Sequence, residues 1–266
     1  MKNEKLKILS HRLSVVASMV PEHVPVADIG CDHAYVSIYM AEHSPDRKVY
    51  ALDVRRGPLE TAAANIKESG CESRIIIRQS DGFDALKKGE TKAAVLSGMG
   101  GKLIVKLLTN GIEKMEPLYE LVLSPQSEPE LVRRFLRKNG FIIHTEEMLE
   151  EEGKFYVVLG ARLVRGIVND TNSVNCFENS DVVNNQNIDR EDSELQNIYD
   201  LFGKNLLEKR NVVLFKYLKE EEHKQRKVLD MLKLIDTENA SVRADEINKN
   251  LEIIYRAIGF YDMKST

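Results

Sequence analysis

Three acidic residues stand at the ends of three successive apolar segments in the first third of the chain. Asp28 lies near the end of the first segment, Asp53 ends the second, and Asp81 follows the third. Ligands of an open α/β sheet bind where the carboxyl ends of parallel strands meet, so these carboxylates would share one cleft. We expect Asp53 to accept both hydroxyls of a ribose, and Asp81 to accept an adenine amine beside room for the ring at Gly82. Each aspartate alone could be an ordinary turn residue.

The turn after Asp28 predicts a nucleoside that carries positive charge. A dinucleotide site would need GxGxxG here, but only Gly30 is present, and the later glycine positions hold Asp32 and Ala34. The carboxylates would repel a pyrophosphate and attract ammonium and sulfonium groups. The sequence therefore predicts S-adenosylmethionine as the cofactor. We assign to the same site the neighbours of these acids, Cys31, Val54 and Ser80.

A second glycine-rich turn follows the fourth apolar segment, in the sequence LSGMGGK. Three glycines within four positions before a helix indicate either close approach of the backbone to a ligand or a tight strand-to-helix turn. We assign Gly98 and Met99 to the cofactor, and Gly100 and Gly101 to the substrate. Methyltransferases acting on exocyclic amines often carry Pro-Pro-aromatic at this point, and its absence argues against that chemistry.

Apolar segments alternate with helical stretches as far as residue 163, which predicts an α/β fold with a parallel sheet and crossover helices. A first helix is expected over 5–20. The expected strands are 26–29, 49–53, 75–79, 93–97, 121–124, 141–144 and 155–163. The last two lack a helix between them and should form an antiparallel hairpin.

The composition changes near residue 164. The stretch 164–198 carries two basic and seven acidic residues together with eight asparagines, which indicates a linker or a long surface loop. Beyond it, apolar residues recur at alternating spacings of four and three, which predicts two antiparallel helices in a coiled-coil-like hairpin. We therefore expect a cofactor-binding domain over 1–163 and a helical domain over 199–266. The helical domain could be a structural appendage or an arm that holds a large substrate.

Composition also bounds the class of protein. The net charge of -4 excludes a polybasic nucleic-acid tail. Three scattered cysteines do not predict a disulfide framework, and the histidines lack metal-ligand spacing, so we expect no metal. No apolar run approaches the ~18 residues of a membrane helix. The first residues contain no apolar signal-peptide centre, so we expect a cytoplasmic protein without a membrane partner.

Several motifs resemble, in order, those of the TrmK family of bacterial tRNA (adenine(22)-N1)-methyltransferases. They are ADIGCDHAYV, ALDV, SDGF, SGMGG, LSPQ and NGF…EEMLEEEGKFYVV. The resemblance runs from about Ser10 to Leu163 and continues more loosely through the helical tail. It implies a class I, Rossmann-like methyltransferase sheet with a C-terminal coiled-coil domain, and tRNA as the partner. It also implies a cofactor site at Asp28, Gly30, Asp53 and Asp81.

The same resemblance implies which residues face the reacting groups. Asp32, His33, Gly98, Met99 and Gln126 would lie beside the adenine and the transferred methyl group. A carboxylate there would stabilise the positive charge that develops on the ring, so Asp32 is the first catalytic candidate. His33 would be its hydrogen-bonding partner or a later proton acceptor, and Gln126 completes the predicted catalytic set. Asp32 could instead cap the next helix, His33 could be structural, and Gln126 an ordinary turn residue.

The remaining candidates concern the substrate. Tyr35 could pack against a flipped-out base or simply belong to the helix core. Arg12 lies in a Ser-x-Arg-Leu pattern typical of the family's first helix. Arg133, Arg134 and Arg137 lie on one expected helix and could contact phosphates or form a solvated face. We expect a monomer. The alternatives are a methyltransferase for a small molecule or protein, or a non-catalytic scaffold with a decayed methyltransferase domain.

Overall fold

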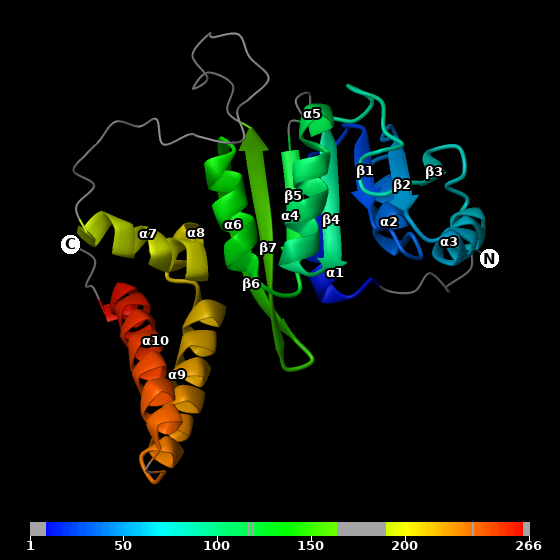
Figure 1. The fold of residues 1–266 in the computed structure, drawn as a ribbon. Helices are drawn as coiled ribbons and strands as arrows, with labels where there is room; N and C mark the ends of the chain where they lie inside the picture. The colour runs from blue at the N-terminus through cyan, green and yellow to red at the C-terminus, as the bar shows by residue number, and fades with distance from the viewer. Residues whose placement is uncertain (1–8, 116–117, 119, 164–189, 236, 263–266) are drawn as a thin grey trace. The chain divides into compact units, whose positions relative to one another are not determined.

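The computed structural model describes residues 9–115, 118, 120–163, 190–235 and 237–262 (Figure 1). The chain forms two compact units, Met1–Leu163 and Val164–Thr266. Each unit is described by itself below. Among the described residues, no helix combines the length and the apolar character that a membrane crossing requires.

The first unit is built on a seven-stranded sheet with the order β3-β2-β1-β4-β5-β7-β6. Its strands are β1 (Val26–Ile29), β2 (Val49–Asp53), β3 (Ile75–Gln79), β4 (Ala93–Met99), β5 (Glu120–Pro125), β6 (Phe141–Glu151) and β7 (Lys154–Leu163). β1 to β5 are parallel, and β7 runs antiparallel to both of its neighbours. The predicted α/β sheet with a final antiparallel hairpin is confirmed, and β6 extends seven residues beyond the predicted end at His144.

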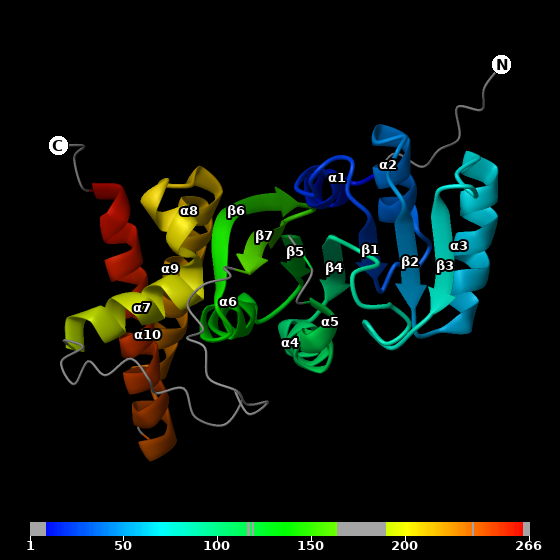
Figure 2. The ribbon, with the colours of Figure 1, turned by 90° about the horizontal axis from the view of Figure 1, so that it is seen from above.

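Helices cover both faces of this sheet. They are α1 (His11–Ser18), α2 (Tyr35–His43), α3 (Arg56–Ser69), α4 (Gly101–Asn110), α5 (Ile112–Met115) and α6 (Pro129–Lys138). Figure 2 shows α1 and α2 on one face and α4 and α6 on the other. With both faces covered, every residue of β1 and β2 is buried, as expected for the central strands of a parallel sheet. The expected helix over 5–20 is shorter than predicted, and residues 1–8 lie outside the described part.

The strand order fixes where a ligand can bind. The chain moves outward from β1 to β3 and then returns to place β4 on the other side of β1. Crevices form outside the carboxyl ends of the strands at such a reversal. The turns that follow β1, β2, β3 and β4 therefore surround one place.

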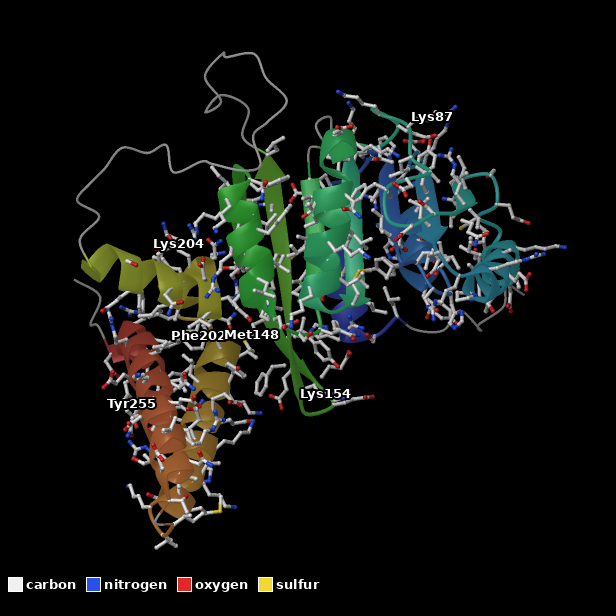
Figure 3. All side chains as sticks on the ribbon, in the orientation of Figure 1. Lys87, Met148, Lys154, Phe202, Lys204 and Tyr255 are labelled. Carbon is white, nitrogen blue, oxygen red and sulfur yellow. The ribbon has the colours of Figure 1, made fainter. Side chains whose placement is uncertain are left out.

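The second unit is helical, with α7 (Arg190–Phe202), α8 (Lys204–Glu208), α9 (Val212–Leu232) and α10 (Glu238–Asp262). α9 and α10 pack together and bury Leu214 and Leu218 of α9 with Ile247 and Leu251 of α10. Tyr255 of α10, labelled in Figure 3, accepts a hydrogen bond of 2.9 Å from Nε of Arg226 of α9. The expected helical hairpin is thus present within this unit.

One expectation for this region needs correction. A linker or long surface loop is predicted over 164–198, but α7 already begins at Arg190, and residues 164–189 lie outside the described part. Asn211 stands between α8 and α9. Its side chain caps α9 by accepting hydrogen bonds of 3.0 Å from the backbone N–H groups of Val213 and Leu214.

Candidate active site

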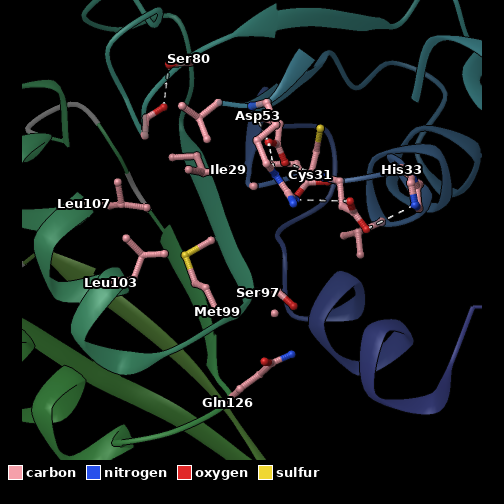
Figure 4. Close-up of a pocket in the computed structure, with 18 of the residues that line it drawn as sticks. Ile29, Cys31, His33, Asp53, Ser80, Ser97, Met99, Leu103, Leu107 and Gln126 are labelled. Carbon is pink, nitrogen blue, oxygen red and sulfur yellow. Dashed lines mark hydrogen bonds and ion pairs between the residues drawn. The ribbon is translucent and has the colours of Figure 1, made fainter. Parts of the chain in front are cut away.

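A cavity of about 800 Å³ lies at the carboxyl ends of β1 to β4 (Figure 4). Most of the residues that the sequence predicted for the site line it. They are Arg12, Asp28, Gly30, Cys31, Asp32, His33, Tyr35, Asp53, Val54, Ser80, Asp81, Gly82, Gly98, Met99, Gly100 and Gln126. The predicted convergence of the three strand-end acids is therefore what the structure shows.

Asp53 is the best anchored of these acids. It ends β2 and is 4% exposed. Its Oδ1 accepts a hydrogen bond of 2.9 Å from the backbone N–H of Arg55, and its Oδ2 accepts one of 3.2 Å from that of Asp32. These donors fix the carboxylate and leave further lone pairs on both oxygens. Such an arrangement suits a pair of ligand hydroxyl groups.

Asp28 lies deeper, within β1, and is 3% exposed. Its Oδ2 accepts a hydrogen bond of 2.6 Å from the hydroxyl of Ser37, a buried residue of α2. Burial raises the pKa of Asp28 from its ordinary value of 3.8 to about 6, although the Ser37 hydrogen bond acts in the opposite direction. Ser37, which stands nine positions after its partner, was not predicted from the sequence.

The turn between β1 and α2 is left-handed at three positions. Gly30, Asp32 and Ala34 have φ angles of 75°, 50° and 62°. A Cβ at Gly30 would lie 2.8 Å from Cε of Met99, the far end of a flexible side chain, so the positive φ is the main requirement for glycine here. Asp32 and Ala34 adopt a conformation that side chains rarely take, which is typical of functional sites. α2 is capped at Ala34 without a side-chain hydrogen bond, so Asp32 is not its cap.

Asp32 is exposed to the cavity, with 56% of its side chain accessible. One of its carboxylate oxygens lies 3.7 Å from Nε2 of His33, and the other lies 3.7 Å from Nη2 of Arg55. Nδ1 of His33 is buried without a hydrogen-bond partner. Asp32 and His33 thus form an accessible polar pair at the cavity wall.

The turn after β3 supplies the third acid. Asp81 is exposed, whereas Ser80 is buried. The Ser80 hydroxyl donates to the carbonyl of Gly82 at 2.9 Å and accepts from the N–H of Ala85 at 3.0 Å. Ser80 therefore shapes the turn and leaves Asp81 to face a ligand.

The opposite wall of the cavity is apolar. Figure 4 shows Met99, Leu103 and Leu107 pointing into it from β4 and α4. Met99 was predicted from the sequence, whereas Leu103 and Leu107, which follow the glycine-rich turn at helical spacing, were not. A site with acids on one wall and aliphatic groups on the other fits a flat ring that carries polar substituents.

Arg12 of α1 lies on the cavity lining. Its guanidinium carbon lies 4.9 Å from the centre of the Tyr156 ring, a cation–π distance. Its Nη1 lies 3.5 Å from Oγ of Ser97, and its Nε is buried without a hydrogen-bond partner. Arg12 is thus a fixed cation at the cavity wall.

Comparisons with known proteins bear on the family. Residues 9–159, more than half of the chain, match the family model described as "Methyltransferase domain". The tRNA (adenine(22)-N(1))-methyltransferase of Bacillus subtilis is 38% identical over 153 residues, which are 58% of this chain and 64% of that relative. The sequence match therefore spans less than two thirds of that relative's length.

The crystal structure of the B. subtilis m1A22 tRNA methyltransferase TrmK is similar with a TM-score of 0.74 at 28% identity. The match covers 96% of this chain and 100% of that one. The chain belongs to the TrmK family of methyltransferases. A Streptococcus pneumoniae protein solved in complex with S-adenosyl-L-methionine, at 24% identity and a TM-score of 0.73, shares the fold over 94% of this chain and 100% of its own.

The structure does not support a substrate role for every residue that we predicted in this TrmK-family chain. Arg133 is 3% exposed and forms an ion pair of 2.8 Å with the buried Glu146, so it cannot meet a phosphate. Arg134 is half-buried and Arg137 exposed on α6, and both have other partners. Neither lines the cavity, so their contact with RNA phosphates stays a prediction.

Gly101 also has a packing role. A Cβ there would lie 2.4 Å from the carbonyl oxygen of Glu128, and its N–H donates to the carbonyl of Ser127 at 2.8 Å. The glycines of this motif thus have two roles. Gly98 and Gly100 line the cavity, whereas Gly101 lets α4 approach the turn before α6. Within the described ranges, no group of three or more acidic, histidine or cysteine side chains could hold a metal ion.

Proposed function

We propose that the protein is an S-adenosylmethionine-dependent tRNA methyltransferase that modifies N1 of an adenine, adenine 22 by its relatives. The observation that carries this proposal is the convergence of Asp28, Asp32 and Asp53 in the cavity of a TrmK-family chain. Three carboxylates in one cleft repel phosphates and favour a cationic nucleoside. The name of the B. subtilis relative supplies the substrate and the position.

The residues present fit the cofactor. Asp53 offers two anchored oxygens to the ribose hydroxyls, and Asp81 an exposed carboxylate to the adenine amine. Asp28 and its buried surroundings suit the methionine ammonium group, and Gly30 leaves the space that a Cβ would fill. The S. pneumoniae protein, which has this fold, was solved with S-adenosyl-L-methionine. When bound, the cofactor supplies an electrophilic methyl group.

Arg12 suits the cofactor's carboxylate better than a phosphate of the RNA. It lies on the cavity lining, and its free Nε–H is buried. Of the two arginines on the lining, Arg55 already lies beside Asp53 and Asp32, at 3.6 and 3.7 Å. Arg12 therefore remains for an anionic group, which changes the substrate role that we expected for it.

The chain's own residues would then act on the adenine. N1 carries an in-plane lone pair and needs no base to remove a proton, so alignment supplies most of the rate. As the ring becomes cationic, the accessible carboxylate of Asp32 stabilises it. His33 holds a hydrogen bond to the exocyclic amine or accepts its proton later. Gln126, whose backbone N–H donates to the Met99 carbonyl at 3.0 Å, and Tyr35 would orient the base.

The substrate must present its base unpaired, since N1 is engaged in a duplex. We propose that the α9–α10 hairpin serves as an arm that contacts tRNA by shape. We further propose that the protein acts as a monomer in the cytoplasm, where its substrate lies.

Methyl transfer to defined RNA tests this function. The full chain is incubated with labelled S-adenosylmethionine and unmodified tRNA, and the RNA is digested to nucleosides and separated. We expect labelled 1-methyladenosine from tRNA with adenine 22, and none from a matched transcript with guanine there. Label in another nucleoside would contradict the atom assigned, and label only in small metabolites or proteins would contradict tRNA as the substrate. Failure to bind the cofactor in calorimetry would favour the scaffold alternative.

A further inference from the structure

We propose that Arg78 and Glu90 form a clamp that positions the adenine-binding loop, defined here as residues 80–90. Both are positioning residues, because neither lines the cavity. The inference rests on the proposed function, since it takes the ligand of this loop to be the adenine end of a nucleoside. Arg78 and Glu90 lie outside the cavity, and the proposed chemistry does not use them. The inference gives this charged pair a role.

The clamp has a strong geometry. Nη1 of Arg78 lies 2.7 Å from one carboxylate oxygen of Glu90, and Nη2 lies 2.7 Å from the other. The two side chains are only 26% and 15% exposed. Paired parallel hydrogen bonds between charged groups are stronger and more directional than ordinary ones. Tyr50 of β2 supports the pair, because its ring centre lies 4.9 Å from the guanidinium carbon.

Electrostatics agree with this geometry. The hydrogen bonds from Arg78 are the main cause that lowers the pKa of Glu90 to about 2. Glu90 also accepts a hydrogen bond of 3.0 Å from the backbone N–H of Lys87. Lys87, labelled in Figure 3, lies in the second half of the loop, which leads into β4. Glu90 thus stays ionised. It joins two parts of the loop through its hydrogen bond with Lys87, and it joins the loop to β3 through Arg78.

The clamp is linked to the cavity through one residue, Ala85. Nη1 of Arg78 donates a hydrogen bond of 3.0 Å to the carbonyl of Ala85. The N–H of Ala85 in turn donates to the Ser80 hydroxyl at 3.0 Å. These two hydrogen bonds hold Ala85 on both sides and close the turn that presents Asp81. Loss of Arg78 would release one side of this closure and let Asp81 move.

A second anchor keeps the loop folded without the clamp. Phe83 is 2% exposed and packs against Gly111, where a Cβ would lie 2.3 Å from the Phe83 ring. Nζ of Lys114 donates to the carbonyl of Phe83 at 3.0 Å. A clamp variant should therefore retain the fold and lose only the fixed position of Asp81.

The test compares Arg78→Met and Glu90→Gln with Arg56→Met. Arg56 is the matched control, because it forms an Arg–Glu pair with Glu60 on the exposed surface of α3. Calorimetry measures the Kd of S-adenosylmethionine and of methylthioadenosine, which contains the adenosine but lacks the amino-acid group. We expect both clamp variants to bind both ligands about tenfold more weakly, with kcat at saturating cofactor unchanged. The control should bind as the wild type does.

Arg78→Lys separates positioning from charge. Lysine keeps the charge but cannot form the paired hydrogen bonds, so its Kd should lie between those of the wild type and Arg78→Met. A folded Arg78→Met protein with unchanged Kd for both ligands would overturn the clamp, as would a loss confined to kcat.

Amide hydrogen exchange tests the clamp without any ligand. In both clamp variants, the amides of residues 81–85 should exchange faster than in the wild type, while those of β1 stay protected. Unchanged exchange at 81–85 would overturn the clamp. If the wild type binds no cofactor, the proposed function fails and the assignment of adenine to this loop fails with it, while faster exchange in the variants would still show that the Arg78–Glu90 pair orders residues 81–85.

Discussion

The acids of the cavity divide into a buried pair and an exposed pair. Asp28 and Asp53 are 3% and 4% exposed and accept hydrogen bonds from Ser37 or from the backbone. Asp32 has 56% of its side chain accessible, and Asp81 is also exposed. Under the proposed function, the buried pair and the exposed Asp81 bind the cofactor, whereas the exposed Asp32 acts on the substrate. The comparison teaches that burial fixes how firmly an acid is held, and that burial alone does not separate binding from catalysis.

The largest effect should follow loss of the anchored acid. Asp53→Ala removes the acceptor of two backbone N–H groups and the proposed ribose partner, so cofactor affinity should fall about 100-fold or more. Calorimetry measures the loss, and a melting curve shows that the variant is folded. The cofactor affinity of Asp53→Asn should lie between those of the wild type and Asp53→Ala. If a folded Asp53→Ala protein bound the cofactor with wild-type affinity, the proposed role of the buried pair in cofactor binding would be wrong.

A smaller effect, on a different quantity, should follow loss of the exposed acid. Asp32→Asn keeps the size of the side chain but removes the charge that would stabilise the cationic ring. We expect kcat to fall about 30-fold, with the Kd of the cofactor within a factor of three of wild type. Single-turnover methylation measures the rate, and Glu72→Gln, an exposed acid away from the cavity, is the control. Normal turnover by Asp32→Asn would remove its catalytic role.

The smallest effect should be a pH dependence from Asp28. Its carboxylate must be ionised to attract an ammonium group, so cofactor affinity should weaken up to about tenfold per pH unit below pH 6. The free energy of unfolding should change in the opposite direction, and decrease as the pH rises. Because the folded pKa exceeds 3.8, the contribution of Asp28 to stability is fully present below that pH and is lost as the pH rises through about 6.

Calorimetry and urea unfolding between pH 4.5 and 8 on the wild type and Asp28→Asn would check both trends. Asp28→Asn should lose this pH dependence in both measurements. The same slopes in the variant and the wild type would assign them to other groups.

Much of this site follows from the sequence, because strand-end acids and a glycine turn are local patterns. Asp28, Gly30 and Asp53 were predicted from apolar segments that stop at defined residues. Contacts between distant segments were not predictable in this way. Ser37 meets Asp28 only after the chain has turned from β1 into α2.

The basic cluster shows the same limit. Arg133 looked like part of a basic surface, yet it lies on the same helix face as the buried Val132 and Leu136. Its partner Glu146 is on a different element, and charge alone does not reveal which arginine of a cluster is covered. The start of α7 inside a polar, asparagine-rich stretch was missed because composition described the stretch as a whole.

Cys31 lies in the cavity lining, directly before Asp32 in the sequence. Burial, and then the charges of Asp28, Asp53 and Asp32, raise the pKa of its thiol far above its ordinary value. Only the thiolate reacts readily with oxidants and alkylating reagents. The thiol in the lining of the proposed methyl-transfer site is therefore held in its less reactive protonated form, and Cys31 in the empty protein should react slowly with iodoacetamide.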